Sequence, residues 1–239
     1  MPYNQGALIT ESNIKSEVGA IIVAAGVGTR MGGVEKIRSP LGGQPVLSRV
    51  VAVFVGCAAV NRIVIVLAES NIGWGKALVA ESGWSKVTSV CPGGARRQDS
   101  VAAGLKELDG CDWVIVHDGA RPLLREKLIS DGLAAAQETG AAAAAVPVND
   151  TIKLAGDDRV VEETLPRERL WVVQTPQLFR HDVITAAYRE VAADVTDDAA
   201  LVEQWGGRVK LYPGAYDNIK VTTQFDLALA GVLLESYEE

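Results

Sequence analysis

Five short, continuous apolar runs recur along the first 150 residues of the chain. They cover 20–25, 62–68, 86–90, 112–116 and 142–148. Continuous rather than alternating hydrophobicity is typical of parallel strands that are buried on both faces. The stretches between them, 45–55, 72–81, 99–108 and 125–139, suit helices in length and composition. This strand–helix alternation predicts an α/β fold with a Rossmann-like, doubly wound and mostly parallel sheet.

The pattern changes after residue 150. Strand-like segments at 151–154 and 160–165 flank a turn, and a further strand is predicted at 170–173. Because this part lacks a long apolar face, we expect a β-arm over about 150–177 that projects from the sheet and forms a homodimer. Helices at 181–193, 197–204 and 223–236 and a strand at 208–212 complete the pattern, with Thr223 and Asp226 as a capping box.

Length and composition place the chain among ordinary globular proteins. Its 239 residues fit one domain over 18–239, preceded by a leader at 1–17 that we expect to be disordered. A net charge of -7 argues against partners such as nucleic acid or a membrane surface, but it leaves room for a local basic pocket. No apolar run reaches the ~18–20 residues that a membrane span requires.

Three widely spaced cysteines indicate neither a disulfide framework nor a zinc knuckle, and favour a cytoplasmic location. With only two histidines, a divalent metal must sit on carboxylates and substrate oxygens, which points to Mg²⁺.

A glycine-rich loop directly follows the first predicted strand. It contains Ala24, Ala25, Gly26, Gly28 and Thr29. Glycines let backbone N–H groups approach phosphates closely, and open α/β sheets bind ligands where strands end. The alternative is a tight turn that only requires positive φ.

Two familiar nucleotide loops are excluded here. Met31 stands where a dinucleotide fingerprint needs Gly or Ala, and Gly75-Lys76 lacks the Ser or Thr of a Walker A loop. Instead the loop is followed by cations, Arg30, Lys36 and Arg38, which suit a polyphosphate. For a single lysine, the alternative is an exposed, solvated position.

Two further polar segments follow predicted strands. The first, 92–101, supplies Gly93, Gly94, Arg97 and Ser100, although Ser100 and its neighbour Asp99 suit helix capping equally well. The second is Val-His-Asp-Gly-Ala-Arg-Pro, residues 116–122. Its Asp118 is the best metal ligand in the chain, and the alternative is a turn aspartate. Structural hydrogen bonding is the favoured role for His117 and Arg121.

Seven motifs in order resemble the 2-C-methyl-D-erythritol 4-phosphate cytidylyltransferase family. They are AAGVGTRM, GGARRQDSV, VHDGARP, PVNDTIK, TPQLF, TDDAALVE and NIKVT, and the similarity runs from about Gly19 to Ala230. The resemblance implies a fold of the nucleotide-diphospho-sugar transferase type. It also implies transfer of the cytidylyl group of CTP, with Mg²⁺, to 2-C-methyl-D-erythritol 4-phosphate, with release of pyrophosphate.

The resemblance also implies roles for individual residues. Arg30, Lys36 and Lys220 would act on the reacting phosphates. Nucleotide contacts would come from Ala24, Ala25, Gly26, Gly28, Thr29, Gly93, Gly94, Arg97, Ser100 and Asp118, with Mg²⁺ on Asp118. In the family the arm is exchanged between subunits, so Arg167 and Thr175 would reach the sugar phosphate in the neighbour's site, completed by Thr196 and Asp217. Lys36 lies five residues after Met31, where the family has six, and Arg38 is the alternative cation.

Two alternatives to this activity remain at this stage. A cytidylyltransferase acting on another polyol phosphate, such as ribitol 5-phosphate, would share the nucleotide half. A nucleotide-binding module without catalysis would bind CTP but release no pyrophosphate. Assays of pyrophosphate release with each sugar phosphate discriminate among the three.

Overall fold

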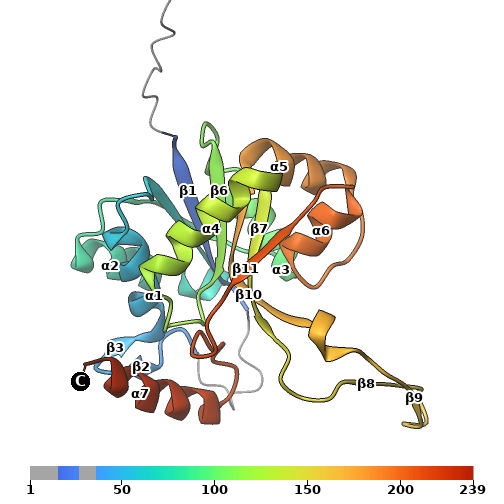
Figure 1. Cartoon of the computed structure of the whole chain (residues 1–239). Coiled ribbons are helices and arrows are strands. Elements are labelled where there is room, and N and C mark those ends of the chain that lie inside the picture. The colour runs from blue at the N-terminus through green and yellow to red at the C-terminus, as the bar shows by residue number, and fades with distance from the viewer. Residues whose placement is uncertain (1–15, 27–35, 239) are drawn as a thin grey trace, which may run out of the picture.

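A seven-stranded sheet in the order β11-β7-β10-β6-β1-β4-β5 organises the residues that this computed structural model describes, 16–26 and 36–238 (Figure 1). All neighbouring strands are parallel except β10, which is antiparallel to both β6 and β7. The strands are β1 (Val18–Ala24), β4 (Arg62–Leu67), β5 (Val87–Pro92), β6 (Trp113–Asp118), β7 (Ala141–Pro147), β10 (Trp171–Arg180) and β11 (Lys210–Pro213). The predicted doubly wound, mostly parallel sheet is confirmed.

Helices cover both faces of this sheet. One face packs against α1 (Val46–Gly56), α2 (Ile72–Ser82) and α4 (Glu126–Thr139), the other against α3 (Arg97–Leu105), α5 (His181–Glu190) and α6 (Asp198–Gln204). Neighbouring residues of β1 serve the two layers separately, because Ile22 faces the first core and Ile21 the second. Both side chains are fully buried, as continuous apolar strands require.

The alanine run at 141–145 illustrates how burial overrides helix propensity. Alanine alone favours a helix, yet these residues form β7 and are fully buried. The small side chains allow α4 to approach the sheet closely, and Gly132 of that helix lies against Leu178 and Tyr212.

Strand β10 is longer than the segment at 170–173 that the pattern predicts. It continues through Gln174, Thr175 and Gln177 to Arg180 and enters the main sheet. The Thr175–Pro176 peptide is cis. The polar side chains of Gln174, Thr175 and Gln177 are buried and hydrogen-bonded, so they form part of a central strand although their composition is typical of a loop.

Smaller elements complete the structure (Figure 1). Strands β8 (Lys153–Ala155) and β9 (Val161–Thr164) form a hairpin that projects from the sheet, followed by a 3₁₀ turn at Arg167–Arg169. A second 3₁₀ turn, Glu69–Asn71, precedes α2. A hairpin of β2 (Pro40–Leu41) and β3 (Gln44–Pro45) lies beside α7 (Gln224–Glu238).

The predicted capping box at the start of α7 is present. Thr223 N donates to Asp226 Oδ2 at 2.8 Å, and Asp226 N donates to Thr223 Oγ1 at 3.2 Å. None of the helices within 16–26 and 36–238 is long and apolar enough to cross a membrane.

Replacing Gly132 with alanine is expected to destabilise the fold by about 2 kcal/mol, because its Cβ would lie 2.3 Å from Leu178 Cδ1 and 2.7 Å from the Tyr212 hydroxyl. Gly231→Ala is the control, since nothing lies within 4 Å of its Cβ in α7. That variant is expected to gain about 0.5–1 kcal/mol from helix propensity. Urea denaturation measures both, and equal shifts in the two variants would contradict this packing.

Candidate active site

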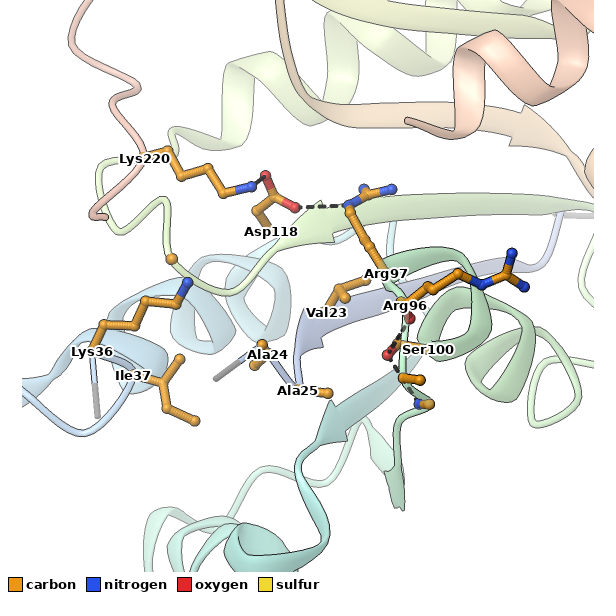
Figure 2. Close-up of a pocket in the computed structure, with 14 residues that line it drawn as sticks. Val23, Ala24, Ala25, Lys36, Ile37, Arg96, Arg97, Ser100, Asp118 and Lys220 are labelled. Atoms are coloured by element: carbon orange, nitrogen blue, oxygen red, sulfur yellow. Dashed lines mark hydrogen bonds and ion pairs between the residues drawn. The ribbon is translucent and has the colours of Figure 1, made fainter. Parts of the chain in front are cut away.

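The carboxyl ends of β1, β5 and β6 meet at one edge of the sheet and open into a cavity of about 310 Å³ (Figure 2). The parallel register sets this arrangement, because Val23 of β1 pairs with Asp118 and the next residue, Ala24, pairs with Leu67. Nine residues predicted from the sequence line the cavity: Ala24, Ala25, Gly26, Lys36, Gly94, Arg97, Ser100, Asp118 and Lys220.

Two glycines bring backbone close to this cavity. A Cβ at Gly93 would lie 2.4 Å from Ala25 Cβ, and one at Gly94 would lie 2.3 Å from Asp99 Cβ. Ser100 fixes the turn, since its Oγ accepts from Gly94 N at 3.2 Å and donates to Arg96 O at 3.3 Å (Figure 2). Asp99 accepts from Arg96 N at 3.0 Å, which is one contact of a capping box at the start of α3. The capping alternative for Asp99 is therefore confirmed.

Asp118 lies at the centre of the site and faces three cations. Lys220 Nζ is 2.8 Å from Oδ2, Arg97 Nε is 3.3 Å from Oδ1, and Arg121 Nε is 3.6 Å from Oδ2. Burial by itself would raise the pKa of Asp118, but the charges of Arg97, Lys220 and Arg121 outweigh it and hold the pKa well below its usual range. The carboxylate is therefore ionised throughout the physiological range.

Arg97 also bridges to a second carboxylate. Its Nη1 is 2.7 Å from Asp198 Oδ2, and the Tyr188 hydroxyl donates to Asp198 Oδ1 at 2.5 Å. Asp198 is 1% exposed and belongs to α6, so this contact attaches α6 to the site. The sequence analysis did not single out Asp198, whose position after Thr196 and Asp197 is typical of a helix N-terminus. Indeed Asp197 caps α6.

The lysines extend from different segments into the same space. Figure 2 shows the amino group of Lys36 pointing to the same side of the cavity as that of Lys220, whereas the guanidinium of Arg96 turns away from them. Lys36 Nζ would lie 3.9 Å from a Cβ at Gly26. Arg38, the alternative cation, lies over the Trp74 ring at 5.2 Å and does not line this cavity.

Four further predicted residues, Arg167, Thr175, Thr196 and Asp217, do not line this cavity. Gly28, Thr29 and Arg30 are outside the described residues. Arg167 is exposed on the arm, where its Nη1 donates to Asn149 O at 2.9 Å. Thr196 is exposed and lies two residues before Asp198, and Asp217 pairs with Arg125. Thr175 is 4% exposed, and its hydroxyl contacts Asp118 N and His117 Nδ1.

Several buried polar atoms around the site have no hydrogen-bond partner within the described part of the chain. They include Arg97 Nη2, Arg121 Nε, Asp217 Oδ1 and Asn218 Oδ1. Buried donors and acceptors are nearly always satisfied, so such a group needs an explanation. Two of the four atoms belong to arginines that face Asp118, and guanidinium donors suit an anionic ligand.

A glycine-lined cavity with surrounding cations, at the carboxyl ends of parallel strands, is typical of α/β proteins that bind a phosphorylated ligand. The profile of the IspD family, described as 2-C-methyl-D-erythritol 4-phosphate cytidylyltransferase, matches residues 18–236. A protein of that name from Dehalococcoides mccartyi is 50% identical over 222 residues, which cover 93% of this chain and 98% of the relative. The chain therefore belongs to the IspD family of cytidylyltransferase enzymes.

Solved structures agree with this assignment. A 4-diphosphocytidyl-2C-methyl-D-erythritol synthase from Anaerococcus prevotii matches with a TM-score of 0.82 and 30% identity, over 92% of this chain and 99% of that one. The Thermus thermophilus 2-C-methyl-D-erythritol 4-phosphate cytidylyltransferase matches with a TM-score of 0.72 and 31% identity, over 90% and 98%. The family resemblance predicted from the ordered motifs is confirmed, and the ribitol 5-phosphate alternative is not favoured.

His117 makes the stability of the fold sensitive to acid. Burial lowers its pKa to about 3, and Asp118 opposes this shift only in part. The unfolded chain, with an ordinary histidine pKa near 6.5, therefore binds the proton more readily, so stability is lost as pH falls below ~6.5. Between pH 7 and pH 5 we expect His117 to remove about 2 kcal/mol from the free energy of unfolding.

Urea denaturation at the two pH values measures this loss. His117→Gln is expected to reduce it, because glutamine does not titrate in this range. An equal loss in His117→Gln and the original protein would contradict a buried neutral imidazole.

Proposed function

We propose that this site joins the cytidylyl group of CTP to 2-C-methyl-D-erythritol 4-phosphate, giving 4-diphosphocytidyl-2-C-methyl-D-erythritol and pyrophosphate. The observation that carries the proposal is the group of cations around one carboxylate in a glycine-lined cavity. Arg97, Arg121 and Lys220 face that carboxylate and Lys36 lines the same cavity. The net charge of the whole chain is -7. A local excess of positive charge in an acidic protein suits two crowded anions.

In this reaction a phosphate oxygen of the sugar attacks the α-phosphorus of CTP. One P–O bond forms, the bond to the leaving pyrophosphate breaks, and no covalent enzyme intermediate is required. No general base is needed either, because the attacking phosphate is already ionised. The protein must instead hold two anions in line and offset their repulsion, so catalysis consists of positioning and electrostatics.

Lys36 and Lys220 are suited to the reacting phosphates by their place in the cavity. Lys220 is paired with Asp118 at 2.8 Å, so an arriving triphosphate would compete with a single carboxylate for its ammonium. We assign Arg30 to the same task because the resemblance of its motif, AAGVGTRM, to the family implies that role. Gly93, Gly94 and Ser100 are suited to the cytidine, because the glycine turn that Ser100 holds puts no side chain between the backbone and the cavity.

A divalent cation fits this donor set only as a partner of the nucleotide. The described residues contain no group of three or more His, Cys, Asp or Glu side chains that could hold a metal. Mg²⁺, however, commonly binds through one carboxylate together with substrate phosphates and water. Asp118 is the carboxylate that would hold it, and the ion would supply charge neutralisation at the phosphates. The three free cysteines favour a cytoplasmic setting for the enzyme.

The projecting arm suits a homodimer. It and the adjoining start of β10 expose large apolar side chains: Leu154, Val160, Val161, Trp171, Val172 and Val173. A two-stranded hairpin of this kind is marginal alone and is stabilised by docking. Arg167 follows the hairpin and is exposed, so a partner's site could receive it. Thr196 and Asp217 are proposed to complete the sugar-phosphate side of the site.

Removing one cation is expected to lower turnover by about a hundred- to a thousandfold, by analogy with other preorganised donors. Pyrophosphate release is measured for Arg30→Ala, Lys36→Ala and Lys220→Ala with CTP, Mg²⁺ and either methylerythritol phosphate or ribitol 5-phosphate. Lys127→Ala is the control, because Lys127 pairs with Asp131 on the surface. All four proteins are expected to fold normally. Activity like that of the original protein in Lys36→Ala would refute its assignment, and preference for ribitol phosphate would refute the substrate.

Exchange of the arm predicts complementation between two defective variants. Arg167→Ala and Lys220→Ala are each expected to be nearly inactive. If the arm is exchanged, each site combines Lys220 of one subunit with Arg167 of the other. A dimer of one subunit of each variant then has one site with both residues intact and one site that lacks both. Equal mixing and reassociation should therefore restore roughly a quarter of full activity. Leu154→Glu with Val172→Glu is expected to give a monomer by light scattering, whereas Phe225→Glu, an exposed apolar position on α7, is the control. No recovery on mixing dimeric variants would argue against an exchanged arm.

A further inference from the structure

A segment with neither helix nor strand, residues 191–197, leads from α5 into α6 and is called the α5–α6 segment below. It lies against the start of α3, the helix that follows the glycine turn proposed to bind cytidine (Figure 1). Thr196 is the residue of this segment that we assign to the sugar phosphate. Whatever fixes the backbone of the α5–α6 segment therefore sets the position of that side of the site.

Gln98, the second residue of α3, bonds to this backbone at two places. Its side-chain Nε2 donates to Ala193 O at 3.2 Å, and its Oε1 accepts from Val195 N at 3.2 Å. The partners fix the orientation of the amide, because a backbone carbonyl can only accept and a backbone N–H can only donate. Two bonds from one planar group hold both the distance and the direction of the backbone at 193–195.

Gln177 of β10 makes a matching pair of bonds where the α5–α6 segment ends. Its Nε2 donates to Asp197 Oδ2 at 2.7 Å, and its Oε1 accepts from Ala199 N at 3.1 Å. Gln177 is buried, so these bonds are sheltered from competing water. Thr196 thus lies between two residues, Val195 and Asp197, that are each held by a glutamine amide.

Other contacts of the α5–α6 segment are less directional. Val191 and Val195 pack against the core on this face of the sheet, but apolar packing sets no bond direction. Arg96 Nη1 is 3.6 Å from Asp194 Oδ1, and both side chains are at least half exposed, so solvent weakens this ion pair. Gln98 therefore specifies the course of the backbone more sharply than these contacts do.

Gln98 stands in the nucleotide motif GGARRQDSV, but its place differs from that of its neighbours. Arg96, Arg97 and Ser100 line the cavity, whereas Gln98 does not. Its side chain extends instead to the backbone at 193–195, directly before Thr196. A substitution of Gln98 is thus expected to act on the site through the α5–α6 segment rather than through CTP.

We propose that Gln98 is a positioning residue for the sugar phosphate: it holds the backbone at 193–195 so that Thr196 is in place before that substrate binds. Thr196 is exposed and lies two residues before Asp198, whose carboxylate is 2.7 Å from Arg97 at the cavity. Without the amide bonds, the segment has to be ordered when the sugar phosphate binds, and that ordering reduces affinity. The inference rests on the sugar-phosphate role proposed for Thr196.

Steady-state kinetics of Gln98→Met test this role, because methionine has nearly the same length but lacks the donor and the strong acceptor of the amide. We expect KM for methylerythritol phosphate to rise about tenfold, the net worth of one or two neutral hydrogen bonds, and KM for CTP to stay within about twofold. Gln137→Met, which changes an exposed glutamine of α4, is the matched control and should keep both KM values. Thermal unfolding of each variant separates loss of folded protein from loss of affinity.

A double variant tests whether Gln98 acts through Thr196. Thr196→Val alone is expected to raise KM for the sugar phosphate, since it removes the hydroxyl. Because Gln98 acts by placing Thr196, adding Gln98→Met to Thr196→Val should raise this KM by less than about twofold further, so that the two effects are not additive.

Three kinetic results overturn the proposal. One is a larger rise in KM for CTP than for the sugar phosphate in Gln98→Met, which would assign Gln98 to the nucleotide instead. Another is kinetics of Gln98→Met like those of the original protein. The third is full additivity in the double variant, which would mean that Gln98 and Thr196 act independently.

Hydrogen exchange of single backbone amides, followed by NMR without substrates, provides a readout that needs no activity. The amide of Val195 donates to Gln98, so it should exchange about tenfold faster in Gln98→Met and at the original rate in Gln137→Met. The amide of Ala199, which donates to Gln177, should keep its rate in both variants.

This measurement separates the inference from the proposed function. Unchanged exchange at Val195 in Gln98→Met overturns the positioning role even if the enzyme has the proposed activity. Faster exchange there, in a protein that releases no pyrophosphate with methylerythritol phosphate, supports the hold of Gln98 on the α5–α6 segment and contradicts the proposed substrate instead.

Discussion

The pocket depends on one carboxylate that faces three cations. Without Asp118, the charges of Arg97, Arg121 and Lys220 would be held together in a partly buried space, where the described residues place Asp198 against Arg97. Two carboxylates against three cations leave one positive charge, which attracts a polyanion without preventing the empty site from folding. Removing either carboxylate would leave buried charge uncompensated, and such loss is costly.

The sheet topology explains how these charges reach one place. Parallel strands deliver Asp118 and the glycine-rich loops to the same edge, as in other open α/β sheets. The antiparallel strand β10 lies between β6 and β7 and places Thr175 beside His117. The loop before α7 then returns to β6, where Val221 N donates to Ala120 O at 2.8 Å. Lys220 is thus anchored on both sides.

The sequence predicted the sheet and the cavity lining well because both depend on local signals. Apolar runs mark buried strands, and polar or glycine-rich segments directly after them mark the edge where ligands bind. The supporting contacts could not be predicted in this way. Arg97 and Asp198 are 101 residues apart, and Arg121 and Asn218 are 97 apart, so only the folded chain shows that they meet. The polar stretch Gln174–Gln177 resembles a loop, since nothing local indicates that its side chains find buried partners.

Those buried polar side chains are understandable from the chemistry that the site performs. A reaction without proton transfer needs no side chain that acts as an acid or a base. This agrees with His117, because burial lowers its pKa to about 3 and both of its ring nitrogens bond to the protein. Such a reaction depends instead on charged side chains that are held in fixed positions. A fully satisfied polar network in a low-dielectric interior is stiff, whereas apolar packing of the same volume would specify position less sharply. The bonds that Thr175 makes to Asp118 N and to Asn218 therefore hold together the segments that carry Asp118 and Lys220.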